Sequence, residues 1–265
     1  MKTPRSGATS FALAVLLGMT TICAAKTFVY VSNAQDGNID AYSMDTSTGS
    51  LTLIGKAEAG KLVMPMAVSP DKKHLYAVVR SQPPRVLTYA IDPTTGALTQ
   101  KASAPLPDSM PYVSTDHTGR YLFTASYGGD QLAVSRIGES GLVEAEPIQV
   151  IPTGRNAHSI LPDRSNKFVY AATLGANQVL QFTFDSKTGK LTPNDPAAVS
   201  PEPGHGLKPD HGSRPRNSDS PALYQRYRRK ASVPGPAGKV RCGSILLKNP
   251  VWNGRDSGWR WLSAR

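Results

Sequence analysis

The sequence contains little cysteine. Its two cysteines are Cys23 and Cys242, and Cys23 lies in a segment that we expect to be removed on export. A single remaining thiol forms no intramolecular disulfide, which excludes a small disulfide-stapled domain. The stability of the fold must then come from burial of apolar surface.

Long hydrophobic runs are also missing. The apolar run at residues 11–19 is well short of the ~20 residues that a membrane-spanning helix needs. It follows the basic residues Lys2 and Arg5 and precedes small residues at 23–25, which is the pattern of a Sec signal peptide. We predict that residues 1–25 are a signal peptide and that the protein is periplasmic or secreted, with no membrane association beyond this peptide. A retained anchor is the alternative.

Negative charge is scarce at one end of the chain. Residues 207–265 contain no glutamate, and their nine arginines, four lysines and three aspartates give a net charge of +10 out of +11 for the whole chain. The remainder is therefore nearly neutral. The basic segment has no zinc-finger spacing, helical periodicity or aromatic stacking motif, so we predict no nucleic-acid partner.

The body of the chain contains a repeat. Residues 45–51, 92–98 and 185–191 read Asp-x-x-Thr-Gly-x-Leu, 47 and 93 residues apart, and residues 138–142 are a shortened copy between them. A period near 47 residues is typical of β-propeller blades. Aromatic positions keep the same step: Tyr30, Tyr76, Phe123 and Tyr170.

Each aromatic lies in a strand-like run that a second such run follows, with turn formers such as Gly128-Gly129-Asp130 between the two. The first set is 27–32, 74–79, 121–126 and 167–173, and the second is 39–44, 86–91, 132–137 and 179–184. A third strand begins at the Leu of the turn motif, and we expect the innermost strand of the next repeat to supply the fourth. The lack of 3.6-residue periodicity excludes helical repeats. The expected fold is all-β, with about four propeller blades over residues 26–206.

The repeat stops abruptly. A further copy would place a strand near residue 217, but residues 216–221 read Arg-Asn-Ser-Asp-Ser-Pro. We therefore predict an irregular, basic, low-order tail over residues 207–265. It is either a genuine disordered appendage or the product of out-of-frame translation. We favour the frameshift, because the break falls within a repeat.

Standard catalytic and metal-binding fingerprints are absent, and a calcium loop would need more acidic ligands than the Asp-x-x-Thr-Gly turn offers. The informative segment is residues 155–159, Arg-Asn-Ala-His-Ser, just before the innermost strand of the fourth repeat. Loops at that position open onto the axial channel of a propeller. His158 is the candidate catalytic residue, because an imidazole can act as a general base or donate to an oxyanion. The alternative is a histidine that only bonds a neighbouring loop.

Three segments carry a resemblance: residues 63–76 (Val-Met-Pro-Met-Ala-Val-Ser-Pro-Asp-Lys-Lys-His-Leu-Tyr), residues 114–117 (Ser-Thr-Asp-His) and residues 157–159 (Ala-His-Ser). They resemble the lactonase family that includes bacterial 6-phosphogluconolactonase and fungal carboxymuconate-lactonizing enzymes. Over residues 27–206 the resemblance implies a seven-bladed propeller that opens or closes small-molecule lactones without metal or organic cofactor. It also implies a monomer when the ring is complete, and a catalytic role for His158.

The other site residues that the resemblance implies, two arginines and a glutamate, belong to later blades. Gly204-His205-Gly206 is followed here by Leu-Lys-Pro, where the family has Pro-Arg-His. We therefore expect a lactone hydrolase of the 6-phosphogluconolactonase type, in carbohydrate metabolism, that is inactive or impaired in this form. The alternatives are a non-catalytic secreted propeller that binds ligands at the cell envelope and a pseudogene product without function.

Overall fold

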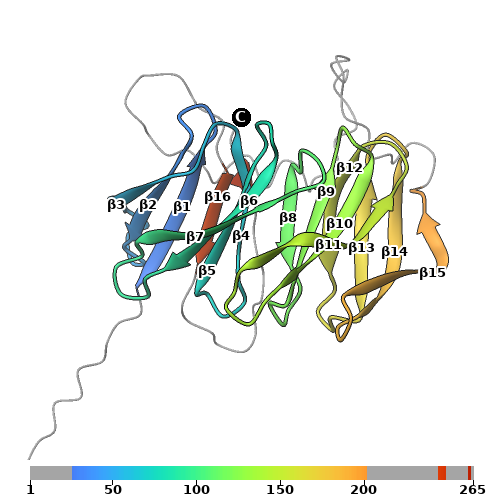
Figure 1. Cartoon of the computed structure of the whole chain (residues 1–265). Coiled ribbons are helices and arrows are strands. Elements are labelled where there is room, and N and C mark those ends of the chain that lie inside the picture. Colours follow the sequence, from blue (N-terminus) through green and yellow to red (C-terminus); the bar gives the residue numbers. More distant parts are fainter. Residues whose placement is uncertain (1–25, 202–243, 249–261, 264–265) are drawn as a thin grey trace, which may run out of the picture.

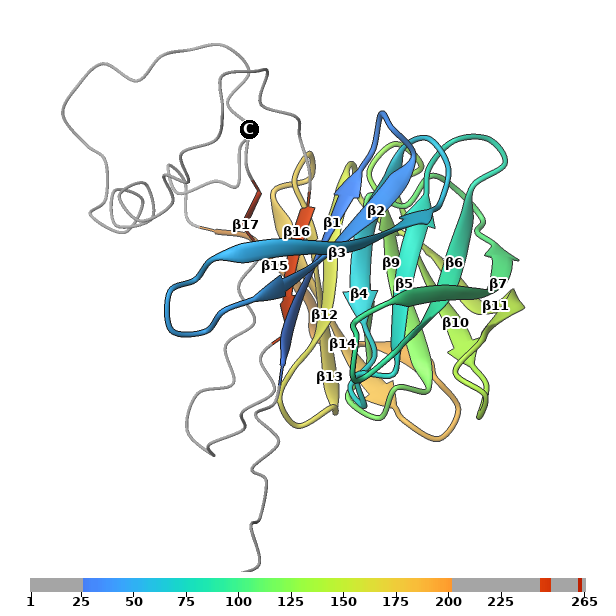
Figure 2. The same cartoon turned by 90° about the vertical axis from the view of Figure 1, so that its left-hand side faces the viewer.

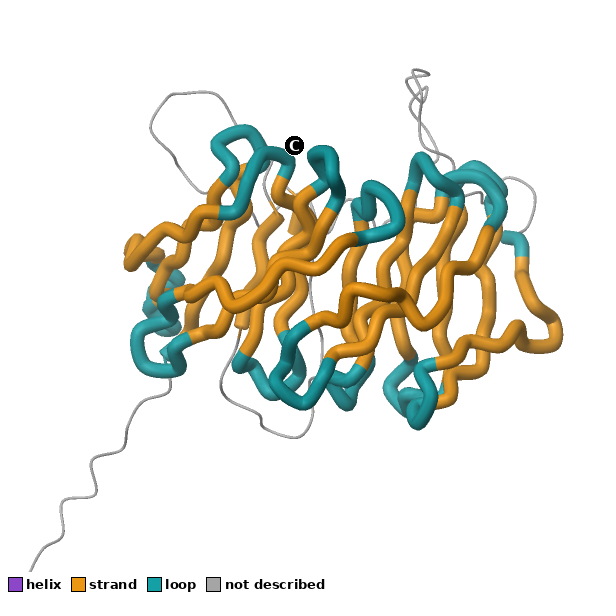
Figure 3. Tube along the Cα trace, in the orientation of Figure 1, coloured by secondary structure: helices purple, strands orange, loops and turns teal. Residues whose placement is uncertain are grey.

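A computed structural model describes residues 26–201, 244–248 and 262–263, and every secondary-structure element in these ranges is a β-strand (Figures 1 and 3). No helix in the described part of the chain is long and apolar enough to cross a membrane. The strands form four antiparallel sheets. The prediction of an all-β fold is confirmed.

The sheets follow the chain order. The first contains β17 (Leu262–Ser263), β16 (Ser244–Lys248), β1 (Thr27–Asn33), β2 (Asn38–Met44) and β3 (Leu51–Glu58). The second contains β4 (Val63–Val68), β5 (His74–Val79), β6 (Arg85–Ile91) and β7 (Leu98–Pro105). The third contains β8 (Tyr112–Thr115), β9 (Tyr121–Ser126), β10 (Gln131–Ile137) and β11 (Val143–Pro152). The fourth contains β12 (Ala157–Pro162), β13 (Phe168–Thr173), β14 (Gln178–Asp185) and β15 (Lys190–Val199).

Consecutive sheets stand side by side, from the blue first sheet to the gold fourth one in Figure 1, and Figure 2 shows the same arrangement after a quarter turn. The inner strands β4, β8 and β12 pack on one another, and so do the outer strands β7 and β11. This is the arrangement of successive blades, so the predicted partial β-propeller is confirmed.

The expected strand runs are found within one residue of their predicted bounds, but their grouping into blades was wrong in one respect. We expected each blade to take its fourth strand from the repeat that follows. Instead β4 pairs with β5, with Val63 opposite Val79, and thus opens the blade that contains β5 to β7. The short turn between β4 and β5 makes them an antiparallel hairpin, and a sequence period does not reveal where one sheet ends.

The inner edge of the first sheet is occupied by a strand from the other end of the chain. There β16 pairs with β1, with Tyr30 opposite Leu246. Thus two short strands, β16 and β17, lie within the region predicted as an irregular tail. The rest of residues 207–265, and the predicted signal peptide, lie outside the described residues.

The core lies between neighbouring sheets. Three clusters of buried apolar side chains fill the three spaces between consecutive sheets. The repeated aromatics Tyr30, Tyr76 and Phe123 are at most 1% exposed, one in each cluster. Successive side chains of a strand point to opposite faces of its sheet, so a sheet that lies between two others contributes to the cluster on each side.

A recurring contact fastens one sheet to the next, and we call it the joint. In each joint two rings lie two residues apart on one sheet, and the first of them packs on the glycine of the tight turn between the outer two strands of the following sheet. Phe28 lies against Gly96 while the Tyr30 hydroxyl donates to the Gly96 carbonyl oxygen at 2.8 Å. Burial, with the Asp92 carboxylate nearby, raises the pKa of Tyr30, so the phenol remains a donor.

The other two joints use the same parts. His74 lies against Gly141, and the Tyr76 hydroxyl donates to the Gly141 carbonyl oxygen at 3.0 Å. Tyr121 lies against Gly189 and itself donates to the Lys187 carbonyl oxygen at 2.8 Å, because Phe123 has no hydroxyl. The joint is therefore a repeated ring-on-glycine contact.

The Asp-x-x-Thr-Gly motif shapes the turn that enters the joint. The amide and the hydroxyl of Thr95, followed by the amide of Thr94, bond the Asp92 carboxylate and hold its pKa below the usual value. Gly96 then takes a φ of +75°, which favours glycine. The motif thus fixes the turn that presents Gly96 to Phe28.

The joint predicts a contrast between two glycines of equal φ. Gly96 and Gly49 both have φ +75°, but a Cβ at Gly96 would overlap the Phe28 ring, whereas one at Gly49 would meet nothing within 4 Å. Gly49→Ala should lower the unfolding free energy by only about 1 kcal/mol, which is the cost of holding a residue with a Cβ at a positive φ. Gly96→Ala should cost about 2–4 kcal/mol, since it adds a clash in a packed core. Urea unfolding followed by circular dichroism measures both, and equal losses would contradict a tight joint.

The turns between the first two strands of a sheet are built on aspartates. Asp163 accepts hydrogen bonds from the amide and hydroxyl of Ser165 and from the amides of Lys167 and Phe168. Its partial burial raises its pKa, but the hydrogen bonds from Ser165 and the three amides outweigh burial and lower the pKa to about 2. The folded state therefore favours the ionised carboxylate.

This depressed pKa predicts an acid-dependent loss of stability. The stabilisation is complete above the ordinary pKa of 3.8 and is lost as the pH falls toward about 2. After allowance for solvent screening, Asp163→Asn should lower the unfolding free energy by about 1 kcal/mol at pH 6. The difference from the unmodified chain should vanish near pH 2. Urea unfolding at several pH values measures this, and a difference that is constant with pH would contradict the assignment.

Candidate functional site

His158 is the second residue of β12, the inner strand of the fourth sheet. The pairing of β12 with β13 shifts register between Ala157 and Ser159, so His158 lies in a β-bulge. A bulge redirects one side chain out of the alternating pattern. Ala157 is accordingly buried, whereas His158, at the start of the strand, is exposed.

The ring of Tyr127 limits where His158 can lie. Its centroid is 6.0 Å from that of the His158 imidazole, and the two planes meet edge to face at 77°. Tyr127 belongs to the hairpin between β9 and β10 in the third sheet. The predicted catalytic residue is thus supported by an aromatic ring from the neighbouring blade.

Asn156 fixes the loop that leads into β12. Its amide donates to the Asp130 carboxylate at 2.6 Å, and its side-chain amide donates to the Tyr127 carbonyl oxygen at 3.1 Å. Asn156 has a φ of +63°, which asparagine tolerates better than most residues. A Cβ at Gly175 would overlap the Asn156 side chain, so that glycine makes room for it. These contacts fix the loop before His158 against the hairpin that carries Tyr127.

A chain of polar groups runs across the same end of the second and third sheets. Arg80 Nε donates to Ser109 Oγ at 3.1 Å, and the Ser109 amide donates to Asp108 at 2.7 Å. Ser126 Oγ donates to the other Asp108 oxygen at 2.6 Å and accepts the Gly129 amide at 2.9 Å. This end of the molecule therefore offers oriented polar groups over three sheets.

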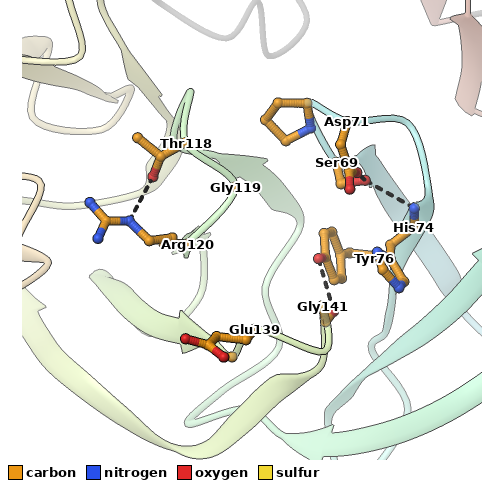
Figure 4. Close-up of a pocket in the computed structure, with 11 residues that line it drawn as sticks. Ser69, Asp71, His74, Tyr76, Thr118, Gly119, Arg120, Glu139 and Gly141 are labelled. Carbon is orange, nitrogen blue, oxygen red and sulfur yellow. Dashed lines mark hydrogen bonds between the residues drawn. The ribbon is translucent and has the colours of Figure 1, made fainter.

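An open pocket of about 190 Å³ lies at the opposite end of the strands, between the second and third sheets (Figure 4). His74 and Tyr76 line one side and Thr118, Arg120 and Glu139 the other. The Arg120 guanidinium bonds Thr118 and the Ser186 carbonyl oxygen, and in Figure 4 it points away from His74. This pocket is space left within the joint of these sheets and is not part of the His158 site.

The described residues contain no group of three or more histidines, cysteines, aspartates or glutamates that could hold a metal ion. The absence of metal and organic cofactors stays a prediction. Residues 207–209, where the sequence departs from the family pattern, lie outside the described residues. The structure therefore assembles His158, Tyr127 and the loops that hold them.

The sequence singled out His158, whose catalytic role stays a prediction, but not the residues around it. Gly128-Gly129-Asp130 was predicted only as a turn, and the aromatic immediately before it was not singled out. An aromatic that flanks such a turn at the loop end of a blade is the signal that points to Tyr127. The long-range pairs Asp130–Asn156 and Arg80–Ser109 have no sequence signal, because they depend on which loops meet.

Comparisons with known proteins bear on the family and on the fold. The family model described as Lactonase, 7-bladed beta-propeller matches residues 26–214. A protein named 6-phosphogluconolactonase from Erwinia tasmaniensis is 38% identical over 181 residues, which cover 68% of this chain and 53% of that protein. One of the same name from Serratia proteamaculans shows the same identity and coverage. The chain spans about half the length of these curated relatives.

Solved structures share the fold. A Bacteroides fragilis protein superposes with a TM-score of 0.62 at 22% identity, over 70% of this chain and 58% of that one. The periplasmic gluconolactonase of Pseudomonas aeruginosa gives a TM-score of 0.59 at 22% identity, over 89% of this chain and 66% of that one. At these identities the likeness establishes the architecture of the blades.

Proposed function

The chain belongs to the lactonase family of seven-bladed β-propellers, and from this we propose that it provides the His158-bearing part of a lactone hydrolase of the 6-phosphogluconolactonase type. The observation that carries the proposal is the exposed His158, held in a bulge at the loop end of an inner strand. The names of the two relatives at 38% identity support the substrate class.

The reaction would proceed by water attack on the lactone carbonyl. His158 takes a proton from the attacking water, the ring C–O bond breaks, and the imidazolium returns the proton to the leaving ring oxygen to give a hydroxy acid. The edge-on Tyr127 ring limits the orientations of the imidazole, and Asn156 maintains that contact. Arg155 is exposed three residues before His158 and provides positive charge for an anionic substrate.

The described blades form only part of such a site. Four sheets are described, whereas the family has seven blades, and the chain spans about half of its relatives. We propose that residues from further blades complete the substrate contacts. The 265-residue chain alone should then hydrolyse lactones poorly or not at all.

A chimera tests this proposal directly. Residues 26–201 are joined to the C-terminal half of the Erwinia tasmaniensis relative, and acid release from 6-phosphogluconolactone and glucono-δ-lactone is followed. We expect the chimera to turn over one or both lactones and the 265-residue chain to be impaired. A folded chimera with no turnover would contradict the proposal and favour the second candidate, a non-catalytic binding propeller at the cell envelope.

We also propose that the protein acts in the periplasm or outside the cell. The support is the predicted signal peptide at residues 1–25. Export also favours the binding-module candidate, because a sugar phosphate made in the cytoplasm would not meet an exported enzyme. Fractionation of expressing cells, with and without residues 1–25, tests the location. Retention of both forms in the cytoplasm would contradict it.

A further inference from the structure

Among the residues that the structure describes, the fourth sheet carries the ring pair of a joint without the turn that occupies it elsewhere. Phe168 and Tyr170 stand two residues apart at the start of β13, as Phe28 and Tyr30 do in β1. Phe28 and Tyr30 are 2% and 0% exposed, whereas Phe168 and Tyr170 are 36% and 40% exposed. We call Phe168 and Tyr170 the open socket.

The first sheet carries the complementary part, also open. Its Asp-x-x-Thr-Gly turn ends in Gly49, and Leu51 follows two residues later. In the fourth sheet the equivalent Gly189 packs on Tyr121 and the equivalent Leu191 is 2% exposed. By contrast, a Cβ at Gly49 would meet no atom of the described residues within 4 Å, and Leu51 is 47% exposed. We call residues 45–51 the open turn.

One chain therefore presents both halves of the contact that already joins its own sheets three times. The turn in residues 45–51 has the same Asp-x-x-Thr-Gly-x-Leu sequence as two of the turns that are seated in the internal joints. The socket offers a phenol at the position from which Tyr30 and Tyr76 donate to a glycine carbonyl. Exposed apolar surface with such a shaped, self-complementary counterpart marks an association site.

We propose that the open socket of one chain binds the open turn of a second copy, so that the 265-residue chains associate head to tail. Phe168 would lie on Gly49, Leu51 would be buried beside it, and the Tyr170 hydroxyl would donate to a carbonyl of the turn. The contact is heterologous, so two copies either close into an eight-bladed ring or continue into an open series. The inference does not depend on lactonase activity.

Complementary variants test the contact. The full chain is studied by sedimentation velocity from about 1 to 100 μM, where we expect concentration-dependent association. Leu51→Glu places a charge in the open turn, and Tyr170→Glu places one in the open socket. Each substitution alone should weaken association by about 30- to 100-fold, as for a central interface residue. Each variant retains the half that the other lacks. A mixture of the two should therefore form a one-to-one dimer that goes no further.

Two additional variants serve as controls, one for the added charge and one for the loss of the Tyr170 hydroxyl alone. Val150→Glu places the same charge on an exposed apolar position of the third sheet and should leave association unchanged. Tyr170→Phe removes only one hydrogen bond and should weaken association about three- to tenfold. Circular dichroism confirms that each variant is folded. A monomer throughout the concentration range, or association that Leu51→Glu and Tyr170→Glu leave intact, would overturn the proposal, as would a mixture that stays monomeric.

Discussion

Replacing His158 by alanine is expected to lower kcat for lactone hydrolysis by about 10²- to 10⁴-fold, the usual contribution of a general base. The measurement is made in the chimera, in which all blades are present. KM should change little, because the imidazole acts on the water and not on the parts of the lactone that give affinity.

His117 provides a matched control for this substitution. It is also an exposed histidine, but it lies in the turn after β8, at the other end of the strands, where its ring bonds the Asp163 carbonyl oxygen. His117→Ala should leave kcat within a factor of about two. Unchanged turnover in His158→Ala, or an equal loss in both variants, would show that His158 has a structural role only.

The second large effect concerns Asp116, which is fully buried between the third and fourth sheets. Its carboxylate accepts the amides of Thr118, Arg120 and Tyr121 and the Thr118 hydroxyl, at 2.6–3.0 Å. It also accepts the Asn166 side-chain amide of the next sheet at 3.0 Å. Asp116→Ala would leave these donors without their acceptor and should cost about 3–4 kcal/mol of unfolding free energy.

The repeat supplies the control for this prediction. Asp163 occupies the same place one repeat later and accepts a similar set of bonds, but it is partly exposed. Asp163→Ala should cost only about 1 kcal/mol, because water can replace the lost acceptor. Ser69 occupies the place one repeat earlier, so Asp116→Ser should be intermediate. Urea unfolding measures all three, and equal costs for Asp116→Ala and Asp163→Ala would show that burial does not decide the effect.

The open socket and the open turn explain why we expect a complete ring to be monomeric. Within the described residues one socket and one turn are open, whereas closure of a ring would use both. The same geometry predicts that the 265-residue chain is poorly soluble, because the open socket and the open turn expose apolar side chains. Suppression of aggregation by Leu51→Glu or Tyr170→Glu would link solubility to the head-to-tail contact.

The frameshift remains a prediction about the gene. The structure describes β16 and β17 inside residues 207–265 and leaves the interpretation of that segment open. Sequencing of the coding DNA around Gly206 addresses it. A second reading frame that restores Pro-Arg-His and further 47-residue repeats would support the frameshift, whereas its absence would show that the basic tail is genuine.

The repeat, the strands and the choice of His158 as the candidate residue could all be read from the amino-acid sequence. A period near 47 residues and alternating apolar residues are local properties, and they were sufficient to find β5 at 74–79 and β9 at 121–126. The Asp-x-x-Thr-Gly motif predicted its turns for the same reason, because its hydrogen bonds connect residues only two or three positions apart.

How these strands and turns contact one another could not be read from the sequence. The grouping of β4 with β5, the Tyr127 ring beside His158, and the seating of Gly96 on Phe28 all depend on contacts between distant residues. The difference between buried Tyr76 and exposed Tyr170, which occupy equivalent places in the repeat, has the same origin. A repeat specifies identical strands, but burial depends on whether another sheet lies against each one.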